Sequence, residues 1–263
     1  MRKLVTYWDG PVSWLERLSV ASMLAAGYEV EIYARDVPGL RREALHHTVN
    51  DVREVMADHP MADLYRRRGN HAFYADYLRL MLMAQSKGIW ADVDCVFRRP
   101  IGPPAGDADY VFGWLNAKRI NNAVLHIPAG SELLRVYLDA LNRVPIRAPW
   151  ATGHIRVKRE LEILVGKTIP FDPDRLAIGP RALTYFVLRL GLERHARPRE
   201  TFYPLTDDEA HILTKPDDRE ATALVGPETV AVHAWRGKLW SIGESGHPPP
   251  TSWLGQRCRE LSV

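Results

Sequence analysis

The sequence predicts an α/β fold with a parallel sheet, because strand-like and helix-like segments alternate from the N-terminus onward. Residues 3–8 have the composition of a short strand, and residues 28–33 alternate apolar and acidic side chains with the two-residue period of a half-buried strand. Between them, residues 14–24 place apolar side chains at helical spacing. Strand, helix and strand in this order open a fold built on parallel strands.

Local signals set the ends of these first elements. Asp9-Gly10-Pro11 breaks the first strand, Ser13 is a suitable N-cap for the helix, and Gly27 ends it. Residues 40–70 are polar and helical, and we expect them to form short helices outside the sheet. The later pattern is assigned by range: helices over 71–87, 131–141, 154–165 and 181–190, strands over 89–97, 110–115, 123–127 and 229–235, and a loop after Gly243 leading to a short terminal helix.

Composition favours one soluble globular domain over residues 1–263. The chain is 46% hydrophobic and 25% charged, and it contains no internal repeat and no convincing linker. No run approaches the roughly 18 to 20 apolar residues of a membrane helix, and residues 1–8 hold no signal-peptide core. We therefore expect a cytoplasmic protein without an integral membrane segment.

The charge balance argues against a nucleic-acid partner. Thirty-five basic residues against 32 acidic ones give a net charge of +3, and the only dense basic cluster, residues 66–68, is typical of a solvated helix end. This excess is too small to argue for a lipid surface, although peripheral membrane contact stays open. Cys95 and Cys258 are far apart and lack zinc-binding spacing, so we expect two bystander thiols.

Asp92 and Asp94 are the first candidates for chemistry. One residue separates them, so in an extended segment both carboxylates project from one face, and paired oxygen donors can bind Mn²⁺ or Mg²⁺. Two other Asp-x-Asp pairs, at 107–109 and 172–174, lie in turn-forming stretches. Asp92 and Asp94 instead interrupt an apolar strand, where an unpaired charge is costly. The residues alone leave two interpretations open, a metal site or a strand end in water.

Asp76 and Arg79 are neighbours on the helix before this strand, three residues apart. By themselves they predict no more than a surface ion pair. However, residues 73–80 followed by 88–94, Phe-Tyr-Ala-Asp-Tyr-Leu-Arg-Leu and Gly-Ile-Trp-Ala-Asp-Val-Asp, resemble the glycosyltransferases with a DXD sugar-binding region. That family includes α1,4-galactosyl- and N-acetylglucosaminyltransferases, yeast outer-chain mannosyltransferases and, distantly, clostridial glucosylating toxins. Trp90 stands where the family usually has Tyr.

Further matches to this family follow in the same order along the chain and cover most of residues 1–241. They are Asn121-Asn122-Ala123-Val124, Gly179-Pro180-Arg181-Ala182-Leu183-Thr184, Phe202-Tyr203-Pro204 and His233-Ala234-Trp235 with Trp240-Ser241. The resemblance implies a GT-A fold, with a Rossmann-like central mixed sheet flanked by helices. It also implies a nucleotide-sugar half over about residues 1–128 and an acceptor half over about 129–263.

The resemblance further implies a metal site and a donor site. Asp94 would bind Mn²⁺ (or Mg²⁺) directly, Asp92 would contact metal and ribose, and His233 would be the remaining protein ligand, although a lone histidine is more often structural. Asp76 and Arg79 would hold the ribose and sugar hydroxyls of the donor.

Other residues would surround the donor. Trp8 would stack on the nucleotide base, with simple core packing as the open alternative. Asn122 and the Gly179-Pro180 pair would line the reaction centre. Trp235 and Lys238 would cover or neutralise the diphosphate, and Gly237 and Gly243 would let that segment move.

The expected activity is therefore retaining transfer of a hexose or N-acetylhexosamine from a UDP-sugar to an acceptor hydroxyl on a glycan, glycolipid or small molecule. A GDP-mannose donor stays open. Two alternatives also stay open: a metal-dependent phosphodiesterase or phosphatase, and a non-catalytic adaptor that binds nucleotide sugars.

Overall fold

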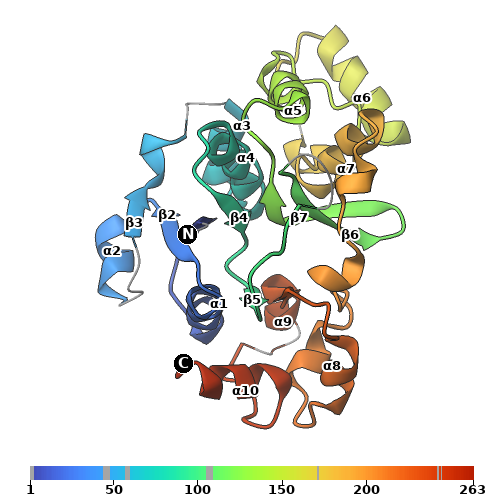
Figure 1. Ribbon diagram of the computed structural model, residues 1–263. Helices are drawn as coiled ribbons and strands as arrows, with labels where there is room; N and C mark the ends of the chain where they lie inside the picture. Colours follow the sequence, from blue (N-terminus) through green and yellow to red (C-terminus); the bar gives the residue numbers. More distant parts are fainter. Residues whose placement is uncertain are drawn as a thin grey trace.

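The centre of the molecule is a six-stranded sheet with helices on both faces (Figure 1). The computed structural model describes residues 3–43, 48–56, 60–104, 109–170, 172–241, 243 and 245–263. The strands of the main sheet are β1 (Lys3–Tyr7), β2 (Glu29–Ala34), β3 (Thr48–Asp51), β4 (Ile89–Ala91), β6 (Val111–Asn116) and β7 (Arg119–His126). A separate two-stranded sheet pairs β5 (Cys95–Phe97) with β8 (Ala231–His233).

The strand order is β3-β2-β1-β4-β7-β6, in which β1 to β4 run parallel and the β6–β7 hairpin joins antiparallel to β4. The predicted α/β class, with a Rossmann-like mixed sheet flanked by helices, is confirmed. From β1 the chain first adds β2 and β3 on one side of β1 and then adds β4 on its other side, so the direction of strand addition reverses at β1. Ligands of open α/β sheets bind at such a reversal, beyond the carboxyl ends of the strands, which here are the ends of β1 and β4.

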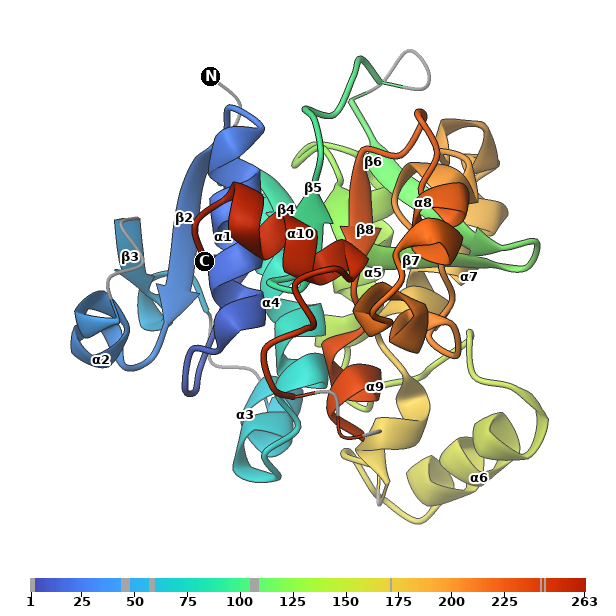
Figure 2. The ribbon, with the colours of Figure 1, turned by 90° about the horizontal axis from the view of Figure 1, so that it is seen from below.

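Ten helices lie in the described part of the chain, and Figure 2 shows α10 beside α1. They are α1 (Trp14–Ala25), α2 (Val37–Arg42), α3 (Pro60–Arg67), α4 (His71–Ala84), α5 (Glu132–Asn142), α6 (Gly153–Leu164), α7 (Pro180–Arg189), α8 (Arg219–Leu224), α9 (Arg236–Ser241) and α10 (Trp253–Glu260). Short 3₁₀ turns span Val52–Glu54, Pro173–Leu176, Glu193–His195, Arg199–Thr201 and Ala210–Thr214. None of the helices in these ranges is long and apolar enough to cross a membrane.

The predicted cap of α1 is present and is reciprocal. The Ser13 side chain accepts from the N–H of Leu15 at 3.2 Å, and the Glu16 carboxylate accepts from the Ser13 N–H at 2.6 Å. This capping box fixes where α1 begins after β1. It also holds the carboxylate of Glu16 fully buried at the helix start, where it needs a counter-charge.

Alternate residues of each strand build the two layers of the core. Val5 of β1 and Trp90 of β4 face the cluster that contains α4, α5 and α7, whereas Leu4 and Ala91 face the opposite side, towards α1. A third cluster joins α1 to β5, β8 and α10. The C-terminal segment is thereby packed against the N-terminal half and closes one side of the sheet.

Three of the expected elements are wrong in detail. Residues 40–70 do not all lie outside the sheet, because β3 pairs with β2 as its edge strand. The expected strand over residues 89–97 is two strands in different sheets, β4 and β5, because the chain turns between them. Residues 229–235 supply only β8, and α9 follows it where a mobile loop was expected, so that Gly237 is helical.

Candidate functional site

The Asp92–Asp94 segment is a turn at the carboxyl end of β4. The N–H of Asp92 donates to the carbonyl of Ala123 at 2.7 Å, and the N–H of Cys95 donates to the carbonyl of Asp92 at 3.0 Å. The sequence predicted that the two carboxylates project from one face of a strand, and this is wrong because the backbone turns here. Each carboxylate instead belongs to a different cluster of side chains, and the turn connects the two clusters.

The first cluster is built around Arg79 of α4, which is 4% exposed. Its guanidinium lies 3.3 Å from Oδ1 of Asp76 and 3.2 Å from Oδ1 of Asp92, donates to the carbonyl of Asn122 at 2.5 Å, and stacks on the ring of Trp90 at 4.7 Å. One buried cation therefore holds two carboxylates that are distant in sequence. A buried charge of this kind is stable only with such compensation.

Asp76 is enclosed by polar groups on several sides. The Asn122 side-chain amide donates to Oδ1 of Asp76 at 2.8 Å. Burial raises the pKa of Asp76 to about 6, and the nearby charge of Asp92 acts in the same direction, while Arg79 and Asn122 oppose the shift. A carboxylate so enclosed is a strong hydrogen-bond acceptor, and it retains fractional protonation near neutral pH.

Gly179 approaches this carboxylate so closely that no side chain fits. A Cβ at Gly179 would lie 2.2 Å from Oδ2 of Asp76. Pro180 begins α7 directly afterwards, so the carboxylate lies against a helix N-terminus, where the helix dipole favours negative charge. The Gly-Pro pair of the sequence therefore belongs to this cluster.

Asp92 connects the first cluster to the second. Its Oδ1 accepts from the indole N–H of Trp90 at 2.6 Å as well as from Arg79, and its side chain is 27% exposed. Burial and the adjacent Asp94 charge raise the pKa of Asp92, while Arg79 and His233 act against that shift. Trp90 has no role in the sequence prediction, but its indole N–H holds the carboxylate of Asp92 in place by this hydrogen bond.

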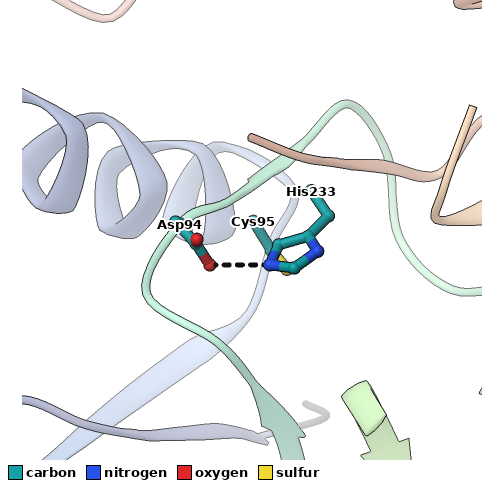
Figure 3. A group of neighbouring side chains, drawn as sticks. All are labelled: Asp94, Cys95 and His233. Atoms are coloured by element: carbon teal, nitrogen blue, oxygen red, sulfur yellow. Dashed lines mark ion pairs between the residues drawn. The ribbon is translucent and has the colours of Figure 1, made fainter. Parts of the chain in front are cut away.

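The second cluster pairs Asp94 with His233 (Figure 3). Their Oδ1 and Nε2 atoms are 3.2 Å apart, and Oδ2 of Asp94 accepts from the backbone N–H of Arg236 at 2.9 Å. Burial works against ionisation of Asp94, yet the charge of His233 and these hydrogen bonds hold the pKa of Asp94 below its usual range. Burial also works against the imidazolium, and Asp94 outweighs it, so the pKa of His233 is raised.

Cys95 is the third member of this cluster. Asp94, Cys95 and His233 are the one group of potential metal ligands, among the residues that the structure describes, whose ligand atoms all lie within 4.8 Å of one another. Burial raises the pKa of the Cys95 thiol well above its usual range, and the neighbouring aspartates raise it further. These effects favour the neutral thiol, and the expected bystander role of Cys95 stays a prediction.

The donor chemistry of this cluster fits a hard or borderline divalent cation. A carboxylate oxygen and an imidazole nitrogen are ligands that Mn²⁺ accepts, whereas the sulfur of Cys95 is a soft ligand more typical of zinc and copper sites. Within the described ranges, Nδ1 of His233 is buried and has no hydrogen-bond partner. A buried polar atom without a partner marks a position that a ligand, ion or water normally satisfies.

Arg236 is a residue that sequence reasoning missed. Its Nε lies 2.6 Å from the buried carboxylate of Glu16, and its guanidinium lies between the rings of Trp8 and Trp240, at 4.8 and 4.6 Å. It supplies the counter-charge that the α1 cap requires. The sequence did offer one indication of its importance: Arg236 lies between Trp235 and Lys238, which are both expected to contact the diphosphate.

The remaining C-terminal candidates lie close to this arrangement but differ in orientation. The ring of Trp235 lies against the ring of His233 in a tilted arrangement, with the centroids 4.1 Å apart. The backbone of Trp235 has a left-handed φ of 56°, which is unfavourable for a side chain of this size. Nζ of Lys238 pairs with the exposed carboxylate of Asp208 at 2.8 Å, so the structure does not bring this amine into either cluster.

A pocket of about 350 Å³ opens beside Trp8. Its walls come from the end of β1, the end of β2 and α2, and include Asp9, Gly10, Asp36 and Leu40. It thus lies at the carboxyl ends of β1 and β2, the end of the sheet at which ligands of this fold class bind. The Arg236 guanidinium covers one face of the Trp8 ring.

In the other two Asp-x-Asp pairs, Asp109 and Asp172 are more open to solvent than Asp92 and Asp94. The side chain of Asp109 is 59% exposed and that of Asp172 is 38% exposed, and the latter pairs with Arg175. Asp107 lies outside the described residues. The structural context therefore separates Asp92 and Asp94 from these pairs.

No protein-family model matches the chain, and no curated protein matches it. Among solved structures, it is similar to the PaToxG glycosyltransferase, with 14% sequence identity and a TM-score of 0.49 over 72% of this chain and 69% of that chain. The case for a function therefore depends on the side chains themselves.

Proposed function

We propose that the protein is a retaining, Mn²⁺-dependent glycosyltransferase that moves a hexose or N-acetylhexosamine from a UDP-sugar to an acceptor hydroxyl. The observation that carries the proposal is the meeting of Asp76, Arg79, Asp92, Asp94 and His233 at the end of β4. These residues come from α4, the β4–β5 turn and β8. They are the residues of the sequence resemblance, and the fold gathers them at the sheet reversal.

Asp94 and His233 would hold the cation. The second carboxylate oxygen of Asp92, which no neighbouring group engages among the described residues, would complete the protein ligands. A bound divalent cation would stabilise the negative charge that develops on the departing diphosphate. Mg²⁺ would serve the same oxygen ligands, and the imidazole favours Mn²⁺.

The chain's own groups would position the donor. Arg79 fixes Asp76 and Asp92, so their carboxylate oxygens can accept hydrogen bonds from ribose and sugar hydroxyls. Trp8 and its pocket would take the nucleotide base, for which a volume of about 350 Å³ is sufficient. Asn122 and the Gly179-Pro180 turn would line the reaction centre beside Asp76.

The C-terminal segment would cover the diphosphate. Arg236 donates its backbone N–H to Asp94 and is the nearer of the two cationic residues on α9. Lys238 would contribute only after leaving Asp208. Groups that are fixed before the reaction stabilise developing charge without reorganisation, which is the main source of catalysis in sites of this kind.

The test is a donor screen on the intact protein with Mn²⁺, in which release of UDP or GDP is measured for UDP-galactose, UDP-glucose, UDP-N-acetylglucosamine and GDP-mannose. We expect one UDP-sugar to be hydrolysed slowly without acceptor. Asp94→Asn should lower that rate by about a hundredfold or more, whereas the exposed Asp109→Asn should leave it unchanged. An active Asp94→Asn variant would contradict the metal assignment.

The same screen separates the alternatives. Hydrolysis of phosphate esters without turnover of any nucleotide sugar would favour a phosphodiesterase or phosphatase. Donor-dependent thermal stabilisation without turnover of any donor, across several acceptors, would favour a binding adaptor. The anomeric configuration of the product, measured by NMR, decides whether transfer occurs with retention.

A further inference from the structure

Helix α6 has its polar side turned towards the protein and its apolar side turned towards solvent. Arg159 is 3% exposed and Glu162 is 7% exposed. By contrast, Val157, Leu161 and Leu164 are 61%, 58% and 80% exposed. Positions four and seven residues apart lie on one side of a helix, so these three residues form a continuous apolar stripe, which Val165 extends. In both views α6 lies at the periphery of the molecule (Figures 1 and 2).

Arg159 fixes this orientation. Its guanidinium donates to the carbonyl of Ile146 at 2.8 Å, to that of Thr168 at 2.6 Å and to that of Lys167 at 3.2 Å, and it pairs with Glu162. Turning the helix to bury the stripe would break all of these contacts and expose a satisfied charge network. The apolar stripe is therefore a stable feature of the surface, and contiguous exposed apolar surface indicates an interaction site.

The segment around the helix is strongly basic. Residues 143–169 contain six basic residues and two acidic ones, a net charge of +4, whereas the whole chain carries +3. The remainder of the molecule is thus slightly acidic, and the basic excess is concentrated where the apolar stripe lies. This distribution favours an anionic partner over a neutral one.

A basic pocket of about 270 Å³ borders the stripe. Arg143, Arg147, Arg156 and Glu160 line it, together with Ala140, Ala148 and Pro149. Arg147 pairs with Glu160 at 2.7 Å, whereas Arg143 and Arg156 have no ion-pair partner within the described ranges. Arg156 directly precedes Val157, so the pocket wall and the stripe lie about 100° apart around α6.

We propose that α6 and this pocket bind the surface of an anionic phospholipid bilayer. The stripe of Val157, Leu161, Leu164 and Val165 enters the boundary between headgroups and acyl chains, and a headgroup phosphate occupies the pocket beside Arg143 and Arg156. An apolar helix face bordered by Lys and Arg is the pattern of helices that lie in a membrane interface. A second copy of the chain fits less well, because two surfaces of charge +4 repel each other. The proposal does not depend on the enzymatic one.

The experiment is co-sedimentation of the full chain with vesicles of phosphatidylcholine alone or with added phosphatidylglycerol. We expect binding to the anionic vesicles, weak or no binding to the neutral ones, and release by salt. The double substitutions Leu161→Ser with Leu164→Ser, and Arg143→Glu with Arg156→Glu, should each weaken partition by about tenfold or more. The controls Leu188→Ser and Arg259→Glu change an exposed leucine and an exposed arginine elsewhere and should have little effect.

Several outcomes would overturn the proposal. These are equal binding to both kinds of vesicle, binding to neither, or full binding by both double variants. Analytical ultracentrifugation of the same variants adds a separate readout: a wild-type dimer that the Leu161→Ser, Leu164→Ser variant loses would assign the stripe to self-association instead. Unchanged melting temperatures would show that the variants are folded, as expected for exposed positions.

Discussion

Asp94 and His233 meet with their Oδ1 and Nε2 atoms 3.2 Å apart, although they come from opposite halves of the chain. The small β5–β8 sheet causes this, because Cys95 and His233 are directly paired in its register. The N–H of Ala234 donates to the Asp94 carbonyl at 2.9 Å and adds a second link. The C-terminal segment is thus tied to the turn that carries both aspartates, and it completes the cluster.

Binding of Mn²⁺ should strengthen as the pH rises from 6 to 8. The pKa of His233 is raised in the folded protein, and an imidazolium cannot bind a metal, so binding must release its proton. Below that pKa the affinity should increase by up to about tenfold for each pH unit. Calorimetry in two buffers of different ionisation enthalpy measures the released proton.

The variant His233→Ala should lose most of this binding and most of its pH dependence between pH 6 and 8. His211→Ala is the matched control, because His211 is exposed and lies outside both clusters. Proton release that persists in His233→Ala would show that another group titrates, and the assignment of His233 would then be wrong.

Replacing Gly179 by Ala should disrupt the first cluster although no charged residue is substituted. The new methyl group would lie 2.2 Å from Oδ2 of Asp76, so the carboxylate must move away from Asn122 and Arg79. We expect a loss of about 1–3 kcal/mol in the free energy of unfolding and weaker donor binding. Urea denaturation and calorimetry with UDP measure the two effects.

The control is Gly130→Ala, where a Cβ meets nothing within 4 Å. Equal stability and equal UDP affinity of the Gly179→Ala and Gly130→Ala variants would rule out the close approach of Gly179 to Asp76.

Neutralising Asp76 should change how stability depends on pH. The folded-state pKa of about 6 is above the ordinary value of 3.8, so between about pH 4 and 6 the native protein binds more protons than the unfolded chain. Its contribution to stability is therefore present at low pH and is lost as the pH rises through 6. At pH 8 Asp76→Asn should be more stable than wild type by about 1–2 kcal/mol, because the wild-type protein must keep a buried carboxylate ionised at that pH. The gain stays this small because Arg79 loses one counter-charge in the variant.

Chemical denaturation at pH 4, 6 and 8 measures this difference, with the exposed Asp139→Asn as control. Parallel pH profiles for wild type and Asp76→Asn would show that Asp76 titrates normally. Donor binding should be weaker in Asp76→Asn at every pH, since stability and function commonly conflict at a binding site.

The sequence predicted the parallel half of the fold because its signals are local. Helix α1 carries its own capping box, and β2 alternates with period two. The sequence did not predict β3. Only Val49 of this edge strand is buried, and one buried residue is too few to produce an alternating pattern. Strand β7 begins at Arg119, earlier than the expected start at residue 123, because its buried polar residue Asn122 is satisfied by Asp76 and Arg79, a contact that no local pattern reveals.

The candidate site could be predicted where the residues share one local element and could not where tertiary packing decides. The pairing of Asp76 and Arg79 follows from helical spacing. The turn at Asp92–Asp94 could not be foreseen, since apolar residues typical of a strand lie on both sides of it and only the switch from one sheet to another breaks the strand. The division into donor and acceptor halves near residue 128 stays a prediction.

Arg236 should matter more to stability than Lys238, although both are cations on α9. Removing Arg236 leaves the buried carboxylate of Glu16 without its counter-charge and separates Trp8 from Trp240, so Arg236→Met should lower the free energy of unfolding by about 2–4 kcal/mol. Lys238→Met breaks only an exposed pair with Asp208 and should cost less than about 1 kcal/mol. The double variant Glu16→Gln, Arg236→Met should be more stable than Arg236→Met alone, because no buried charge is left unpaired. Urea denaturation of all three variants checks the order, and equal losses for Arg236→Met and Lys238→Met would show that the Glu16 pair does not hold the C-terminal segment in place.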